Sequence, residues 1–149
     1  MFSLSGVLTL VHLIGFALGL GGVTVKLYLL LQSVSDFKLI SSYLRVARTI
    51  TRLIVLGIIL LTVSGLATVI LVGARPFTVL FIIKLLGVGA ILIIGPLIDN
   101  VAEPKVRILA PQGAEAPSAQ FRSALRLYVT LEVVATALFY LITIIWVMF

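Results

Sequence analysis

The chain has 149 residues, of which 62% are hydrophobic and only 11% are charged. Soluble domains carry about a quarter charged residues, so this composition excludes a water-soluble globule and predicts an integral membrane protein. There is no cysteine, which excludes disulfides, thiolate metal sites and thiol nucleophiles. Most of the net charge of +6 lies in or beside the segments between apolar stretches, so we expect no nucleic-acid partner.

Four apolar stretches follow one another along the chain, and each reaches the ~20 residues that cross a bilayer as a helix. They cover about residues 4–31, 50–72, 77–98 and 125–149. The first has neither a basic leader nor a small-residue cleavage site, so we expect it to remain as a permanent helix. We predict an all-α polytopic membrane protein, a single domain built as an antiparallel bundle of four transmembrane helices.

The first stretch carries small and polar residues on one face. At 100° per residue, these positions fall within about 80° of one another: His12, Gly15, Gly19, Gly22 and Lys26. Gly15 and Gly19 form the GxxxG spacing that lets another backbone, or a flat ligand, approach closely. The stripe predicts either helix packing or a ligand-binding face.

The segment that follows, residues 32–49, is too polar to span a bilayer. It returns to a helical pattern in which Arg45, Arg48 and Arg52 lie on one side. A basic stripe near a membrane surface is suited to anionic lipid headgroups. An acidic partner protein is the alternative.

The second and third stretches place Ser64, Lys84 and Gly87 on their small or polar faces. Counting ~1.5 Å per residue from the ends of the spans, His12 and Lys84 lie roughly 10–12 Å deep, with Ser64 at a similar level. We expect these three side chains to converge. Two potential cations without a nearby carboxylate would favour an anionic ligand there, with Gly15, Gly19 and Gly87 lining the site.

Residues 99–122 contain Pro104, Pro111, Pro117 and Gly113. This composition is typical of an irregular surface segment, so we predict a cytoplasmic loop without a core of its own.

The last stretch carries Glu132 on its polar face. Lys26 lies about one helical turn away in depth, and its side chain is long enough to cover the difference. We predict an intramembrane ion pair between Lys26 and Glu132. Such a pair either fixes the register of two helices or handles protons or ions.

The basic residues set the topology. Two of the connections are rich in lysine and arginine, whereas the connection between the second and third spans holds only Arg75. Basic connections stay in the cytoplasm, so we predict that both termini lie outside a prokaryotic cytoplasmic membrane.

Several segments resemble a group of small bacterial and archaeal four-helix membrane proteins: 11–22 (VHLIGFALGLGG), 61–66 (LTVSGL), 81–86 (FIIKLL) and 94–97 (IGPL). The group includes predicted membrane proteins of unknown function, the copper-resistance D-type domain and the haem-dependent membrane protoporphyrinogen oxidases, and the first of these is the most similar. In the haem-binding relatives, a first-helix histidine, a later histidine and a third-helix lysine belong to the haem site. The resemblance therefore implies His12 as a candidate axial ligand of haem b, with Lys84 beside it.

The second histidine is missing, because this chain has only one. A haem would need His12 from two subunits, His12 alone, or Met148 as a weaker ligand. No catalytic residue is predicted, since one histidine supports no hydrolytic triad. We therefore expect a non-catalytic bundle that binds haem or another anionic amphiphile through His12 and Lys84, or an accessory subunit. The alternatives are a proton or ion transport component that uses Glu132 and Lys26, and a structural subunit of a larger membrane complex. We expect a homo-oligomer or a membrane-complex partner.

Overall fold

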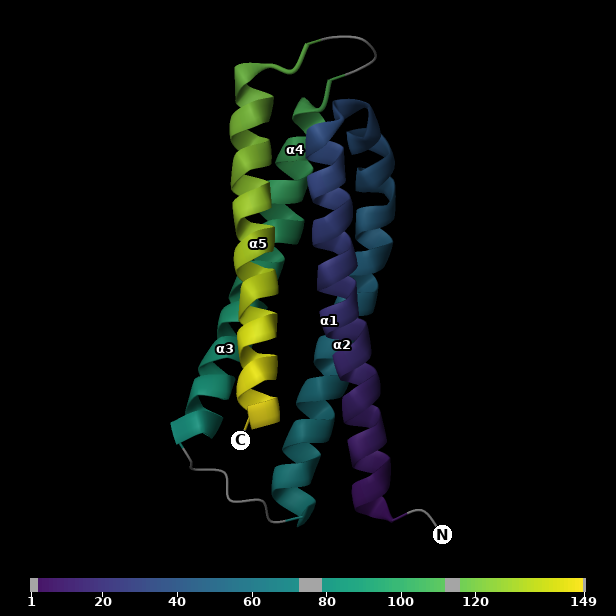
Figure 1. The fold of residues 1–149 in the computed structure, drawn as a ribbon, viewed down its shortest axis with the longest axis vertical. Helices are drawn as coiled ribbons and strands as arrows, with labels where there is room; N and C mark the ends of the chain where they lie inside the picture. Colours follow the sequence, from purple (N-terminus) through teal and green to yellow (C-terminus); the bar gives the residue numbers. More distant parts are fainter. Residues whose placement is uncertain (1–2, 73–78, 112–115, 149) are drawn as a thin grey trace.

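The structure is a computed structural model and describes residues 3–72, 79–111 and 116–148 (Figure 1). Nearly all of these residues are helical. The elements in chain order are α1 (Leu4–Ser35), η1 (Phe37–Leu39), α2 (Ile40–Val72), α3 (Val79–Leu97), η2 (Ile98–Ala102), α4 (Glu103–Leu109) and α5 (Ala119–Met148). The predicted span limits at residues 77 and 149 lie outside the described residues.

Four helical stretches are long and apolar enough to cross a membrane: Leu4–Ser35, Phe37–Leu71, Phe81–Leu109 and Ala119–Ile145. Their outward faces are covered with exposed leucine, isoleucine and valine. Such an exterior is costly in water and matches hydrocarbon, so the structure supports the prediction of an integral membrane protein with a helical bundle.

Polar caps set the limits of α1. The Ser3 hydroxyl accepts a hydrogen bond from the backbone N–H of Gly6 (3.2 Å). At the other end, Asp36 adopts extended backbone, and its carboxylate accepts from the N–H of Lys38 (3.1 Å). The chain then turns through η1 into α2, which begins about ten residues before the predicted second span.

The helix that begins with α3 does not stop at Pro96. It continues through a π-helical segment, η2, into α4 and ends at Leu109. The prediction of an irregular loop over residues 99–122 is therefore wrong at both ends. Residues 99–109 belong to η2 and α4, and residues 119–122 belong to α5. Pro96 removes one backbone hydrogen bond and widens the local winding, but it does not end the helix, because the buried residues Ile98, Ala102 and Val106 continue a packed face.

The helices pack unevenly. α1 lies against α2 over most of its length, and α5 lies against α1 and against α3. Among the described residues, no Cα atom of α3 lies within 8 Å of one in α1 or α2. α3 is therefore held by α5 and by its own continuation.

Two apolar clusters form the core. One includes Leu30, Tyr43, Phe121 and Tyr128 and lies where α1, α2, α4 and α5 meet. The other includes Val23, Ile54, Ile91 and Phe139 and lies further along the bundle.

The two ends of the molecule differ in charge. Both termini lie at one end, which we call the terminal end (Figure 1). At the opposite end, which we call the basic end, lie η1, the beginning of α2, α4 and the beginning of α5. These segments carry Lys38, Arg45, Arg48, Arg52, Lys105, Arg107, Arg122 and Arg126.

Candidate functional site

A buried ion pair joins α1 to α5. Lys26 Nζ lies 2.6 Å from Glu132 Oε1, and each side chain is 3% exposed. The distance and burial agree with the ion pair predicted from the depths of the two residues. Charges so completely removed from water need a partner, so each side chain depends on the other.

A third charged residue joins this pair. Asp99 Oδ1 lies 3.6 Å from Lys26 Nζ, and the Asp99 side chain is 32% exposed. The Thr51 hydroxyl of α2 donates a long hydrogen bond to the same oxygen (3.5 Å). We call Lys26, Asp99 and Glu132 the charged triad.

Sequence reasoning missed Asp99, because the predicted third span ends at residue 98 and Asp99 is the first residue of the predicted loop. The π-helical winding of η2 places Asp99 on the side that faces Lys26. Segments of π-helix are frequent at functional sites. The signal that could have revealed Asp99 is a four-residue repeat, in which Asp99, Glu103 and Arg107 alternate with apolar positions.

Two tyrosines lie on the basic side of the triad. The hydroxyl groups of Tyr43 and Tyr128 are 2.6 Å apart and share a hydrogen bond. Both side chains are buried. Lys26 Nζ lies 5.9 Å from the centroid of the Tyr128 ring, within the range of a cation–π interaction. The Tyr128 ring is thus a third group beside the ammonium, in addition to the two carboxylates.

The triad has one negative charge more than positive when both carboxyl groups are ionised. Glu132 Oε1 forms an ion pair with Lys26 Nζ. The Thr136 hydroxyl, one helical turn further along α5, is buried without a hydrogen-bond partner among the described residues. Both oxygens retain capacity for a proton or a water molecule.

The apolar cluster with Val23, Ile54 and Phe139 closes the triad toward the terminal end. Glu132 itself is 2% exposed. Asp99, at 32%, is therefore the most exposed member of the triad.

His12 and Ser64 meet, as their depths predicted. His12 Nδ1 lies 2.8 Å from Ser64 Oγ, and the Ser64 hydroxyl donates its hydrogen to the carbonyl of Leu60 (2.6 Å). The serine oxygen therefore accepts from the Nδ1–H of His12, which leaves the lone pair of the neutral ring on Nε2.

Lys84 does not complete a compact cluster with His12 and Ser64, because α3 lies apart from α1 and α2. Its ammonium still acts electrostatically on the imidazole. Lys84 is half-buried and forms no ion pair within the described residues.

The glycines predicted to line a ligand site contact other helices instead. A Cβ atom on Gly15 would lie 2.9 Å from the carbonyl oxygen of Gly57 in α2, and one on Gly19 would lie 3.2 Å from the ring of Phe139 in α5. A Cβ atom on Gly87 would likewise lie 2.8 Å from the side chain of Ile142 in α5. These contacts favour helix packing, the first alternative that the glycine stripe predicted.

This packing also bears on haem b. The chain supplies one imidazole. About one helical turn from His12, Gly15 lies directly against the backbone of α2. The residues present do not fit a haem with two histidine ligands inside one protomer.

The arginine stripe on α2 is exposed at Arg45, Arg48 and Arg52, near the basic end. Its contact with lipid headgroups stays a prediction.

No protein family, no curated protein and no solved structure matches this chain.

Proposed function

We propose that this protein is a component of a membrane transport system that moves protons, with the charged triad as its proton-binding site. The observation that carries the proposal is that two carboxyl groups, at 2.6 and 3.6 Å, share one buried ammonium. A buried cluster with an unbalanced negative charge is costly, and binding of one proton removes the imbalance.

The arrangement also supports exchange of that proton. Asp99 is about one-third exposed, whereas Lys26 and Glu132 are buried. A proton would enter at Asp99 and reach Glu132 beside Lys26. The unpartnered Thr136 hydroxyl would bind a water molecule on the next turn. Passage toward the terminal end would require the apolar cluster around Phe139 to open.

The proposal includes a topology. The helices would cross a prokaryotic cytoplasmic membrane as an antiparallel bundle, with the basic end in the cytoplasm and both termini outside. Because a 149-residue bundle is small for alternating access, we propose a homo-oligomer or a complex with another membrane protein. The resemblance to small four-helix membrane proteins of unknown function fits this size and stays a prediction.

The test is proton flux through liposomes that contain the purified protein. Wild-type protein is expected to dissipate an imposed pH gradient, under a clamped membrane potential, faster than empty liposomes. Glu132→Gln is expected to lower this flux to the level of empty liposomes, because an amide takes up no proton at neutral pH. Asp99 would still neutralise Lys26, so this variant should fold.

The matched control is Glu103→Gln. Glu103 is also a buried carboxylate, and it pairs with Arg107 at 2.7 Å outside the triad. It should leave the flux unchanged. Wild-type flux no greater than that of empty liposomes, or equal flux in Glu132→Gln and wild type, would contradict the proposal and leave the ion pair with a structural role.

A second candidate function is binding of an anionic amphiphile between His12 and Lys84. It is favoured by the position of Lys84, which lies in α3, a helix without acidic residues, and has no ion pair among the described residues. The hydrogen bond from His12 to Ser64 fixes the imidazole at the edge of this region.

This candidate predicts that protein purified from its native membrane retains an anionic lipid or a porphyrin. Extraction and mass spectrometry would identify it, and an absorption spectrum would reveal a porphyrin. Lys84→Gln should lose the molecule while the helical content stays the same, and Lys105→Gln, at an exposed lysine of the basic end, should retain it. Equal retention in Lys84→Gln and wild type would exclude the site.

A further inference from the structure

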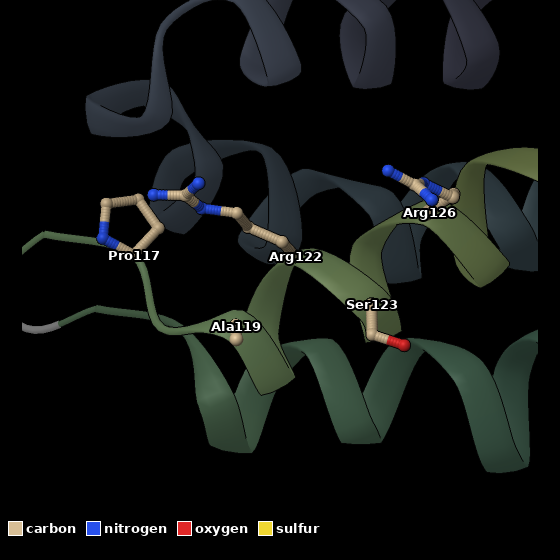
Figure 2. Close-up of a pocket in the computed structure, with 5 residues that line it drawn as sticks. All are labelled: Pro117, Ala119, Arg122, Ser123 and Arg126. Atoms are coloured by element: carbon tan, nitrogen blue, oxygen red, sulfur yellow. The ribbon is translucent and has the colours of Figure 1, made fainter.

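A cavity of about 400 Å³ opens on the surface at the start of α5. It is lined by Pro117, Ala119, Arg122, Ser123 and Arg126 (Figure 2). None of these residues belongs to the charged triad or to the region around His12. The cavity therefore needs an explanation of its own.

The two arginines make the cavity strongly basic. They are separated by one helical turn, which places their Cβ atoms about 6 Å apart. In Figure 2 both guanidinium groups rise from the same side of α5, and Arg122 extends back over the ring of Pro117. Among the residues that the structure describes, none that lines the cavity is acidic, and neither arginine forms an ion pair.

The helix itself adds to this charge. Ser118 caps α5, with its hydroxyl accepting from the N–H of Phe121 (3.1 Å). The first turn of this long helix directs the positive end of its dipole toward the cavity at Ala119. A tetrahedral oxyanion is the group that two arginine forks beside a helix N-terminus bind best.

The place of the cavity in the bundle identifies the source of that anion. α5 has 30 residues, which corresponds to a length of about 45 Å, whereas the hydrocarbon core is about 30 Å thick. The predicted apolar span begins at about residue 125, which places the first turns of α5 in the headgroup layer at the basic end. Phosphate groups of lipids are concentrated at this level.

We propose that this cavity binds the headgroup phosphate of an anionic phospholipid between Arg122 and Arg126. Clusters of basic residues next to the end of a transmembrane helix are suited to such headgroups. The site is independent of the proton-binding function proposed above, because it shares no residue with the triad.

The experiment is native mass spectrometry of the purified full-length protein in mild detergent, titrated with phosphatidylglycerol. Wild-type protein should bind one molecule more tightly than the rest. The double variant Arg122→Ala/Arg126→Ala should weaken this binding roughly 10- to 30-fold, as expected for the loss of two arginines at a membrane surface. Arg122→Lys/Arg126→Lys keeps the charge but loses the forked donors, so its affinity should be intermediate.

The matched control is Lys38→Ala/Lys105→Ala, which removes two exposed basic residues at the same end that do not line the cavity. It should change the affinity less than about threefold, which separates a defined site from general electrostatic attraction. Circular dichroism would verify that each variant is folded.

Three outcomes would overturn the proposal. Equal losses in the two alanine pairs would mean diffuse attraction. Equal binding of phosphatidylcholine, insensitive to Arg122 and Arg126, would mean that the negative charge is not recognised. Displacement of the lipid by inorganic phosphate at the same concentration would identify a site for a soluble anion instead.

Discussion

Replacing Lys26 by methionine is expected to lower the free energy of unfolding by about 3–5 kcal/mol, because it leaves two carboxyl groups in the bundle without their cation. Methionine has a similar length, so the loss reflects charge rather than volume. The ammonium lies 2.6 Å from Glu132 and 3.6 Å from Asp99, and it is almost completely buried. Equilibrium unfolding in mixed detergent micelles, followed by far-UV circular dichroism, would measure the change.

A second substitution makes this prediction specific. In Lys26→Met/Glu132→Gln, the deeply buried carboxylate is removed together with the ammonium, so most of the lost stability should return. Lys105→Met, at an exposed lysine of α4, should stay within about 0.5 kcal/mol of wild type. If Lys26→Met were as stable as Lys105→Met, the triad would not be a buried charged cluster.

The second large effect is expected at Gly57, where α1 and α2 are closest. A Cβ atom there would lie 2.5 Å from Gly19 N and 2.7 Å from Gly15 O. These atoms belong to the backbone of α1 and cannot rotate away, so the two helices would have to separate. Gly57→Ala should destabilise the protein by about 2–3 kcal/mol, at the upper end of the range for overpacking. The same unfolding measurement applies.

The control is Gly21→Ala in α1. A Cβ atom at Gly21 would meet nothing within 4 Å, so alanine should leave the stability unchanged or raise it through its greater helix propensity. A Gly57→Ala variant as stable as wild type would show that the backbones of α1 and α2 are not in direct contact.

The position of charged residues along the bundle could be predicted from the sequence, because a helix advances by a constant rise per residue. Lys26 and Glu132, and likewise His12 and Ser64, meet at the depths derived from that rise. The lateral arrangement could not be predicted in the same way. Lys84 has a depth similar to that of His12, but α3 packs against α5 and leans away from α1 and α2. Which helices become neighbours depends on how their surfaces fit, and hydrophobic periodicity alone does not encode this fit.

Asp99 illustrates a second limit. Proline is a strong signal for the end of a helix, and Pro96 lies two residues before the predicted end of the third span. In a bundle, tertiary packing can compensate for one lost backbone hydrogen bond. Here Ile98, Ala102 and Val106 are all buried on the continuing helix. The third member of the triad thus lies in a segment that local rules assign to a loop.

The attachment of α3 to α5 has a consequence for how the protein is made. α1 and α2 leave the ribosome first and can pair at once, since their contact requires no other element. α3 follows, but its partner α5 is synthesised after it. Until α5 arrives, the nascent chain holds Lys26 and Asp99 without Glu132, so this helix completes the packing of α3 and the charged triad in one step.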